Sequence, residues 1–224
     1  MTRLAIFDCD GTLVDSGASI HTAVAETFAE HGIAIPSPSD SRRVIGLSLV
    51  EAMAALIPEA GAADHVALSG TYKLKFSQAR AAGRIEEPLF DGIAELLDRL
   101  EADGWLLAVA TGKSDRGLGH CLNCHGMGAR FVSLQTSDRH PSKPHPSMAL
   151  QAIADAGAVP ETTIVIGDTA YDMGMARAAG ATGIGAAWGY HDAAELLAGG
   201  ALAIADQPLD VLPAIERMGA TIDG

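Results

Sequence analysis

The chain lacks an excess of positive charge. Its 224 residues include 15 lysines and arginines against 28 aspartates and glutamates, which gives a formal net charge of −13 at pH 7. Proteins that bind nucleic acid usually carry a basic stripe or patch, and the sequence contains no such run. We therefore expect no nucleic-acid partner. A small phosphorylated ligand is still compatible with this balance, because its binding depends on local charge and on metal ions.

Cysteine and long hydrophobic runs are also scarce. Three cysteines, two of them close together, cannot build a disulfide framework, and they favour a reduced protein. The most compact apolar run, residues 105–110, has the length of a strand and falls far short of the roughly 18 residues of a membrane span. No apolar stretch of the secretory type precedes the first carboxylates. We expect a cytoplasmic protein without a membrane partner.

The pattern along the chain predicts an α/β fold. Residues 15–84 show helical periodicity and no convincing strand, with a linker or turn over residues 35–40. From residue 85 onward helices alternate with strands, which is typical of βαβ units and a parallel sheet. The predicted strands cover residues 4–7, 105–110, 131–134, 163–166, 183–187 and 201–204. The expected division is a core of residues 1–14 and 85–224, with an all-helical segment at residues 15–84.

Two carboxylates follow the first predicted strand. Asp8 and Asp10 come directly after the apolar residues 4–7, and Gly11 permits a sharp turn of the backbone. Open α/β sheets bind their ligands at the carboxyl ends of the strands. Two acids held this close repel one another, so the pair favours a cation or a proton-transfer task. Taken alone, an acidic turn explains the pair equally well.

Other polar residues are predicted at strand ends or in loops of the same sheet. Thr111 and Gly112 end the strand at 105–110, Lys143 follows in a loop, and Asp168 and Asp172 follow the strand at 163–166. In a doubly wound sheet these residues would meet in one crevice. Carboxylates, a lysine and a hydroxyl beside a helix N-terminus suit Mg²⁺ and a phosphoryl group.

These motifs, in this order, resemble those of the haloacid dehalogenase superfamily. The matching segments are Asp8-Cys9-Asp10-Gly11-Thr12-Leu13-Val14-Asp15-Ser16, Thr111, Lys143 and Gly167-Asp168 with Asp172. The helical segment between the first and second motifs resembles the cap of the phosphoglycolate-phosphatase-like branch. The resemblance implies a doubly wound, Rossmann-like parallel sheet with a small all-helical cap inserted after the first strand.

The resemblance also implies a role for each motif residue. Asp8 would be the nucleophile and a metal ligand, and would form an aspartyl-phosphate. Asp10 would protonate the leaving alcohol and then activate water, while its backbone carbonyl helps to hold the metal. Thr111 and Gly112 would bind the phosphoryl oxygens, and Lys143 would neutralise their charge. Asp168 would be a ligand of Mg²⁺, and Asp172 would be a further ligand or lie next to one.

Substrate choice is expected to depend on the cap. Residues 42–48 resemble the cap loop that dips toward the core site in this branch, and Gly46 would permit its close approach. Arg43 would meet a substrate carboxylate, or would be an ordinary solvated arginine. Lys73 and Lys75 are interpreted as an exposed helix face.

One further pattern, Cys121-Leu122-Asn123-Cys124-His125, matches the haem-attachment spacing. We expect no haem because the chain carries no export signal. A zinc site that includes His120 lacks a second ligand pair at suitable spacing. The favoured interpretation is core cysteines with surface histidines.

The function expected from these residues is hydrolysis of a phosphomonoester. The cofactor would be Mg²⁺, the substrate a small phosphorylated metabolite, and phosphoglycolate is the first guess. An acid at the position of Asp10 favours phosphoester chemistry over dehalogenation. The alternatives are a β-phosphoglucomutase-like phosphomutase, a pyrophosphatase and a non-catalytic regulatory binding protein. The sequence leaves a monomer and a homodimer equally open.

Overall fold

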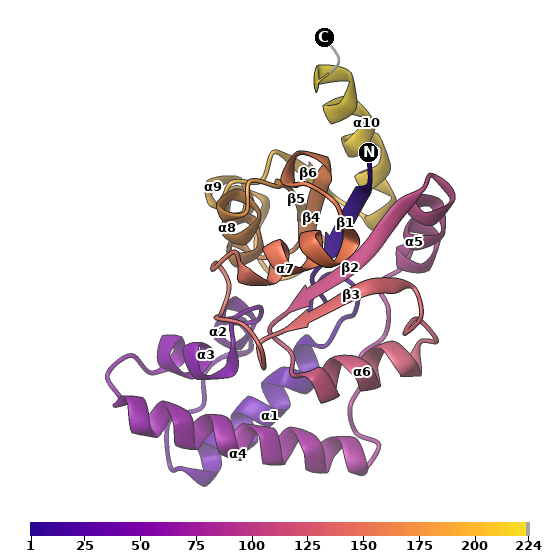
Figure 1. The fold of residues 1–224 in the computed structure, drawn as a ribbon. Coiled ribbons are helices and arrows are strands. Elements are labelled where there is room, and N and C mark those ends of the chain that lie inside the picture. Colours follow the sequence, from indigo (N-terminus) through magenta and orange to yellow (C-terminus); the bar gives the residue numbers. More distant parts are fainter. Residues whose placement is uncertain (223–224) are drawn as a thin grey trace.

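Six parallel strands form one sheet in the computed structural model, which describes residues 1–222 (Figure 1). In spatial order they are β3 (Phe131–Thr136), β2 (Trp105–Thr111), β1 (Arg3–Phe7), β4 (Thr163–Gly167), β5 (Thr182–Ala186) and β6 (Ala203–Ala205). The central strand β1 pairs with β2 on one side and with β4 on the other. This strand order places a topological switch point at β1, where loops at the carboxyl ends part and leave a crevice. The structure confirms the predicted α/β fold with a doubly wound parallel sheet.

Helices cover both faces of the sheet, as the alternation of side chains along β1 requires. Ala5 and Phe7 pack in one buried cluster, and Leu4 and Ile6 pack in a second cluster on the opposite face. The first cluster includes residues of α5 (Ile93–Ala102), α6 (Asp115–Cys124) and α10 (Val211–Ile222). The second includes residues of α7 (Ser147–Ala156) and α8 (Ala170–Ala178), and α9 (Ala193–Gly199) packs on α8.

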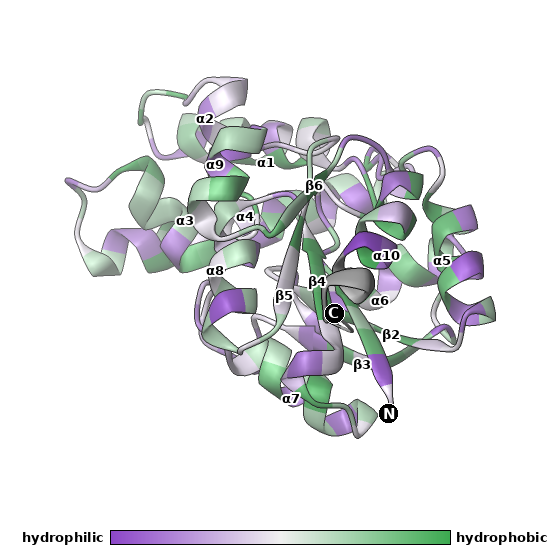
Figure 2. Ribbon diagram, turned by 90° about the horizontal axis from the view of Figure 1, so that it is seen from above, coloured by the Kyte–Doolittle hydropathy of each residue, from purple (hydrophilic) through white to green (hydrophobic). Residues whose placement is uncertain are grey.

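The central strand β4 is mainly hydrophobic, whereas the surrounding helices mix hydrophobic and hydrophilic residues (Figure 2). Short 3₁₀ helices cover Pro160–Thr162 and Pro208–Asp210. The helix α10 was not predicted from the sequence, although Val211 and Ala214 bury its inner face. Within residues 1–222, no helix is both long and apolar enough to cross a membrane.

Four helices between β1 and α5 pack on one another beyond the carboxyl ends of the strands (Figure 1). They are α1 (Gly17–Glu30), α2 (Pro38–Arg43), α3 (Leu49–Leu56) and α4 (Ala62–Ala81), and we call them the helical insert. A small apolar cluster holds them together, with Phe28, Met53 and Leu68 almost fully buried.

The helix α2 corrects the linker predicted over residues 35–40. Ser37 caps this helix, because its hydroxyl accepts a hydrogen bond from the Asp40 backbone N–H, and Pro38 occupies the first turn. The two prolines that suggest a linker therefore flank a capped helix start.

The chain leaves the core and returns to it through one paired joint. The Asp15 backbone N–H donates to the Pro88 carbonyl at 2.9 Å, and the Phe90 N–H donates to the Leu13 carbonyl at 3.1 Å. Between these bonds Val14 and Leu89 form an antiparallel bridge. Both crossings of the chain therefore lie side by side, close to Asp10.

Candidate active site

Asp8 lies at the centre of the candidate site, directly after β1. Its backbone N–H donates to the Ile166 carbonyl of β4 at 2.9 Å, which fixes the residue in line with the sheet. The side chain is buried, and its Oδ1 lies 2.8 Å from the Lys143 Nζ. Among the described residues, Oδ2 has no hydrogen-bond partner. A buried carboxylate oxygen without a partner is costly unless a ligand or a reacting group uses it.

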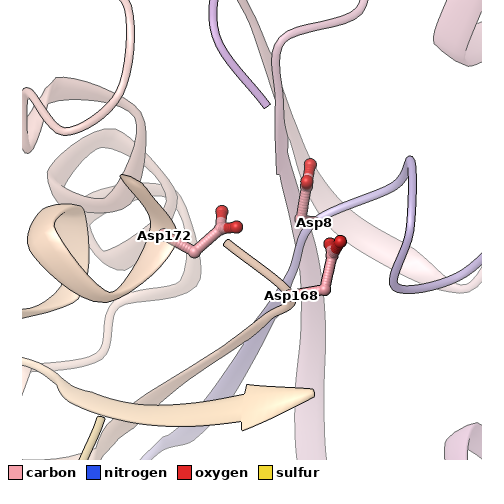
Figure 3. Close-up of side chains that lie close together, drawn as sticks. All are labelled: Asp8, Asp168 and Asp172. Carbon is pink, nitrogen blue, oxygen red and sulfur yellow. The ribbon is translucent and has the colours of Figure 1, made fainter. Parts of the chain in front are cut away.

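Two further carboxylates share this space with Asp8. Carboxylate oxygens of Asp8, Asp168 and Asp172 all lie within 4.8 Å of one another, and all three side chains are buried. Figure 3 shows them pointing into one region from the end of β1, the end of β4 and the start of α8. The three acids meet because β1 and β4 are neighbours in the sheet.

The proximity of these acids changes their proton affinities. Burial raises the pKa of Asp8 to about 7, with Lys143 opposing the shift and Asp172 adding to it. Burial also raises the pKa of Asp168 well above its ordinary value, and the charges of Asp8 and Asp172 add to that effect. A divalent cation among the three oxygens would remove this repulsion, and hard oxygen donors are the ligands that Mg²⁺ prefers. The donor set therefore fits a magnesium site.

Glycine is required where the backbone passes Asp168. Gly11 has a φ of +90°, and a Cβ there would lie 2.2 Å from the Asp168 Oδ2. A Cβ on Gly189 would lie 2.1 Å from the Asp168 Cβ. The carboxylate itself accepts hydrogen bonds from the Thr12 hydroxyl at 2.8 Å and the Tyr190 N–H at 2.9 Å. Asp168 is thus fixed from both sides.

Lys143 connects Asp8 to α8. Its Nζ lies 2.6 Å from the Asp172 Oδ1 as well as 2.8 Å from Asp8, and its side chain is fully buried. Burial alone would lower the pKa of Lys143, but the two carboxylates raise it above its ordinary value. Asp172 also belongs to a capping box at the start of α8, in which its Oδ2 accepts from the Thr169 backbone N–H at 3.1 Å. The same oxygen accepts from the Thr169 hydroxyl at 2.6 Å. The ammonium is therefore charged and fixed in position.

Asp10 lies outside the cluster of three acids that the structure brings together. Its carboxylate accepts a short hydrogen bond from the Ser16 hydroxyl, and its Oδ1 lies 2.7 Å from the Lys113 Nζ. Lys113 in turn lies 2.6 Å from the Glu87 Oε1. Sequence reasoning missed Lys113 and Glu87. The only local signal was the position of Lys113 two residues after Thr111.

Thr111 and Gly112 lie at the end of β2, on the other side of β1 from Asp168. Thr111 is buried, and its hydroxyl oxygen accepts from the Lys113 backbone N–H at 3.2 Å. Its hydroxyl hydrogen remains available to a ligand. Gly112 has a different environment, because a Cβ on it would lie 2.5 Å from the Leu47 carbonyl oxygen. The helical insert therefore touches the core at this glycine.

The loop between α2 and α3 is the part of the helical insert that reaches the core. Gly46 has a φ of +96°, and the Ser48 N–H donates to the Ser142 hydroxyl at 2.7 Å. A Cβ on Gly112 would lie 3.0 Å from the Gly46 carbonyl oxygen, so this loop lies close to the end of β2. Arg43 is not brought to the three acids: its guanidinium pairs with Glu195 and is largely exposed.

The side chains of Cys121, Cys124 and His125 have separate environments, and His120 lies with its Nε2 3.5 Å from the Cys124 Sγ. Cys121 is buried with its Sγ 3.9 Å from the Sγ of Cys9, whereas Cys124 ends α6 and is exposed. His125 contacts the Glu87 carbonyl at 2.7 Å. In the described part of the chain, the three aspartates are the only group of His, Cys, Asp or Glu side chains that converges closely enough for a metal ion. The interpretation as core cysteines is therefore confirmed for Cys121 and wrong for Cys124.

Comparison with known proteins adds to this geometry. The chain is 32% identical over 220 residues to the probable phosphatase IndB of Dickeya dadantii, covering 97% of this chain and 95% of that protein. It is 32% identical over 189 residues to a phosphoglycolate phosphatase of Xylella fastidiosa, covering 84% and 81% respectively. A crystal structure of a hydrolase from Pseudomonas syringae superposes with a TM-score of 0.84 at 27% identity, covering 96% of this chain and 99% of that one.

A family model described as haloacid dehalogenase-like hydrolase matches residues 5–186. That range contains Asp8, Thr111, Lys143 and Asp168, the residues on which the resemblance of the motifs depends. The chain therefore belongs to the haloacid dehalogenase-like hydrolases.

Proposed function

We propose that this protein is a Mg²⁺-dependent phosphomonoester hydrolase that works through an aspartyl-phosphate at Asp8. The observation that carries the proposal is the buried Asp8 carboxylate, which has one oxygen paired with Lys143 and one without a partner among the described residues. An unpaired carboxylate oxygen is free to act as a nucleophile. The phosphatases found among its relatives support the same chemistry.

The first step transfers the phosphoryl group to the protein. An oxygen of Asp8 attacks phosphorus, the bond from phosphorus to the ester oxygen breaks, and Asp10 donates a proton to the departing alkoxide. Lys143, 2.8 Å from Asp8, offsets the negative charge that gathers on the phosphoryl oxygens. The Thr111 hydroxyl and the Gly112 N–H are proposed to bind those oxygens.

The second step releases phosphate. Water attacks phosphorus, the bond between phosphorus and the Asp8 oxygen breaks, and the now ionised Asp10 accepts the proton from water. The same carboxylate thus acts as acid and then as base, which requires it to lie beside both the leaving oxygen and the incoming water.

Asp8, Asp168 and Asp172 would hold the metal directly or through a neighbouring ligand, and the Asp10 backbone carbonyl is a further proposed ligand. When bound, Mg²⁺ neutralises the repulsion between the carboxylate nucleophile and an anionic substrate. The convergence of the three carboxylates supports this assignment.

Phosphoglycolate is the first substrate to test, because a phosphoglycolate phosphatase is among the relatives at 32% identity. We propose that the helical insert acts as the cap over residues 1–14 and 85–224. The contact of its loop with Gly112 supports a role in shielding the substrate from water.

The test is phosphate release, with and without Mg²⁺, from phosphoglycolate, sugar phosphates and pyrophosphate. A preferred monoester with strict Mg²⁺ dependence is expected, and Asp8→Asn should lower the rate at least about 1,000-fold while the circular dichroism spectrum is unchanged. Retained activity in Asp8→Asn would overturn the mechanism. Absence of release from every compound would point to a phosphomutase or a binding protein, and preference for pyrophosphate would point to a pyrophosphatase.

A further inference from the structure

Two lysines whose side chains are almost inaccessible each pair with two carboxylates in this site. Lys143 pairs with Asp8 and Asp172, whereas Lys113 pairs with Asp10 and Glu87. The side chains of Lys113, Asp10 and Glu87 are 8%, 10% and 7% exposed, so solvent screens this second group very little. The nucleophile and the proposed acid–base residue therefore have separate cationic partners.

Lys113 is also held in place by an ion pair with Glu87. This glutamate lies in the segment that returns from the helical insert to the core, next to Pro88 of the paired joint. An ammonium has three donor hydrogens, and contacts at 2.6 Å to Glu87 and 2.7 Å to Asp10 fix its direction. The negative charge of Glu87 alone would balance the positive charge of Lys113. The lysine therefore does not need its additional contact with Asp10 for charge balance.

The insert closes over the same ammonium. The Lys113 Nζ lies 6.0 Å from the centre of the Phe76 ring of α4, and the Tyr72 ring stacks on Phe76 at 5.7 Å. The Asp10 carboxylate is thus paired with a lysine that lies near the insert. A leaving group enclosed between the core and the insert would lie beside this pair.

We propose that Lys113 is a positioning residue, braced by Glu87, that holds the Asp10 carboxylate in place for proton transfer to the leaving group. The inference rests on the proposed function, in which Asp10 is the acid. In the same structure Ser16 supplies a second contact to Asp10. Lys113 contacts Thr111 through its backbone N–H, which a substitution of the lysine side chain leaves in place.

This role has a kinetic signature that a purely structural role lacks. An alkoxide leaves slowly unless it receives a proton, whereas p-nitrophenolate leaves without one. Displacing Asp10 should therefore slow the release of an alkyl alcohol far more than the release of p-nitrophenol. Single-turnover measurement of leaving-group release isolates the first step from the later hydrolysis of the phosphoenzyme.

The experiment compares Lys113→Met, Lys113→Arg and Glu87→Gln with the unaltered enzyme on its preferred alkyl phosphomonoester and on p-nitrophenyl phosphate. For Lys113→Met we expect a loss of about 100-fold on the alkyl ester and less than about 10-fold on p-nitrophenyl phosphate. Lys113→Arg should recover part of the loss. Glu87→Gln should cause a smaller loss, which again falls mainly on the alkyl ester. The matched control is Lys73→Met, which removes an exposed lysine of α4 and should leave both rates unchanged.

A second arm tests whether Lys113 acts through Asp10. In an Asp10→Asn background, Lys113→Met should cause little further loss on the alkyl ester, because the residue that it positions is already inactive. Equal losses on both esters, or a full additional loss in the Asp10→Asn background, would overturn the inference. If Lys113→Met does not fold, Glu87→Gln and Lys113→Arg decide the question by the same ratio of the two esters.

Failure of the proposed function gives a different result. In that case the unaltered protein would release no leaving group from either ester, or Asp8→Asn would remain active. An enzyme that requires Asp8 and shows no selective loss in the Lys113 and Glu87 variants contradicts only the role of Lys113.

Discussion

Gly112 of the core and Leu47 of the helical insert face each other where the core and the insert meet. A Cβ on Gly112 would lie 2.5 Å from the Leu47 carbonyl oxygen and 3.0 Å from that of Gly46. Both obstacles are backbone atoms, which a rotamer change cannot move aside. In this chain, the absence of a side chain there permits the insert to reach the core.

The first prediction follows from this contact. Gly112→Ala should lower the free energy of unfolding by about 1–3 kcal/mol, because the added methyl group forces the two backbones apart. Chemical denaturation measures the change. The control is Gly119→Ala in α6, where a Cβ meets no atom within 4 Å, and where alanine should be neutral or stabilising by up to about 1 kcal/mol. Equal stability of Gly112→Ala and the unaltered protein would show that the loop does not rest on Gly112 in solution.

The second prediction concerns the ion pairs of Lys143. Lys143→Met leaves Asp8 and Asp172 buried without their cation, and we expect a loss of about 3–5 kcal/mol in the free energy of unfolding above pH 7, where Asp8 is ionised. Arg84→Met is the control, because its ion pair with Glu26 is half-exposed and should contribute less than about 1 kcal/mol. Similar losses in the two variants would contradict a buried network.

The third prediction concerns pH in the metal-free protein. The pKa of Asp8 rises from 3.8 to about 7 on burial, so between these values the folded state binds the proton more strongly than the unfolded state. Stability contributed by protonated Asp8 is therefore present below about pH 4 and is lost as the pH rises to about 7. Asp168, whose pKa is also raised by burial, acts in the same direction.

Denaturant unfolding in the presence of a chelator, repeated between pH 4 and pH 8, measures this slope. Asp8→Asn should flatten it, because asparagine does not titrate. Addition of Mg²⁺ should restore most of the lost stability at pH 7 and above, since a cation favours the ionised carboxylates. A stability that rises with pH over this interval would show that the acids are not forced together as the structure has them.

The fourth prediction separates the two roles open to Arg43. Its guanidinium pairs with Glu195, so Arg43→Ala and Glu195→Ala should have the same small effect on stability, below about 1 kcal/mol. We expect both variants to retain the KM of the unaltered enzyme within about twofold, as for the loss of an exposed ion pair. A large rise in KM for Arg43→Ala alone would support the substrate contact predicted from the sequence.

The sequence predicts the core of this molecule well because its physical causes are local. The apolar runs before Asp8 and Asp168 specify buried strands, and the parallel sheet then brings their carboxyl ends together. Lys143 lies on no strand, and its place beside Asp8 followed from the resemblance of the motifs. Thus Asp8, Asp168, Asp172 and Lys143, which the structure brings together, could be named before their geometry was known.

The features that could not be predicted from the sequence depend on contacts between distant segments of the chain. Lys113 and Glu87 are 26 residues apart, and neither has a neighbour in the sequence that marks a buried ion pair. The helix α2 was missed because Pro36 and Pro38 suggest a linker, whereas Ser37 and Asp40 make a reciprocal cap that begins a helix. Cys121 and Cys124 differ in burial because Cys121 packs against Cys9 of the core, whereas Cys124 lies at the exposed end of α6.

The paired joint between residues 13–15 and 88–90 separates the helical insert from the core within one chain. Both passages of the backbone are tied to each other by hydrogen bonds, and β1 keeps its own pairing with β2 and β4. The helical insert is joined to the core at this one site. A change in the length or sequence of the insert therefore leaves the register of the central strand unchanged. Under the proposed function, the insert can therefore change its substrate contacts while the residues of the core stay as they are.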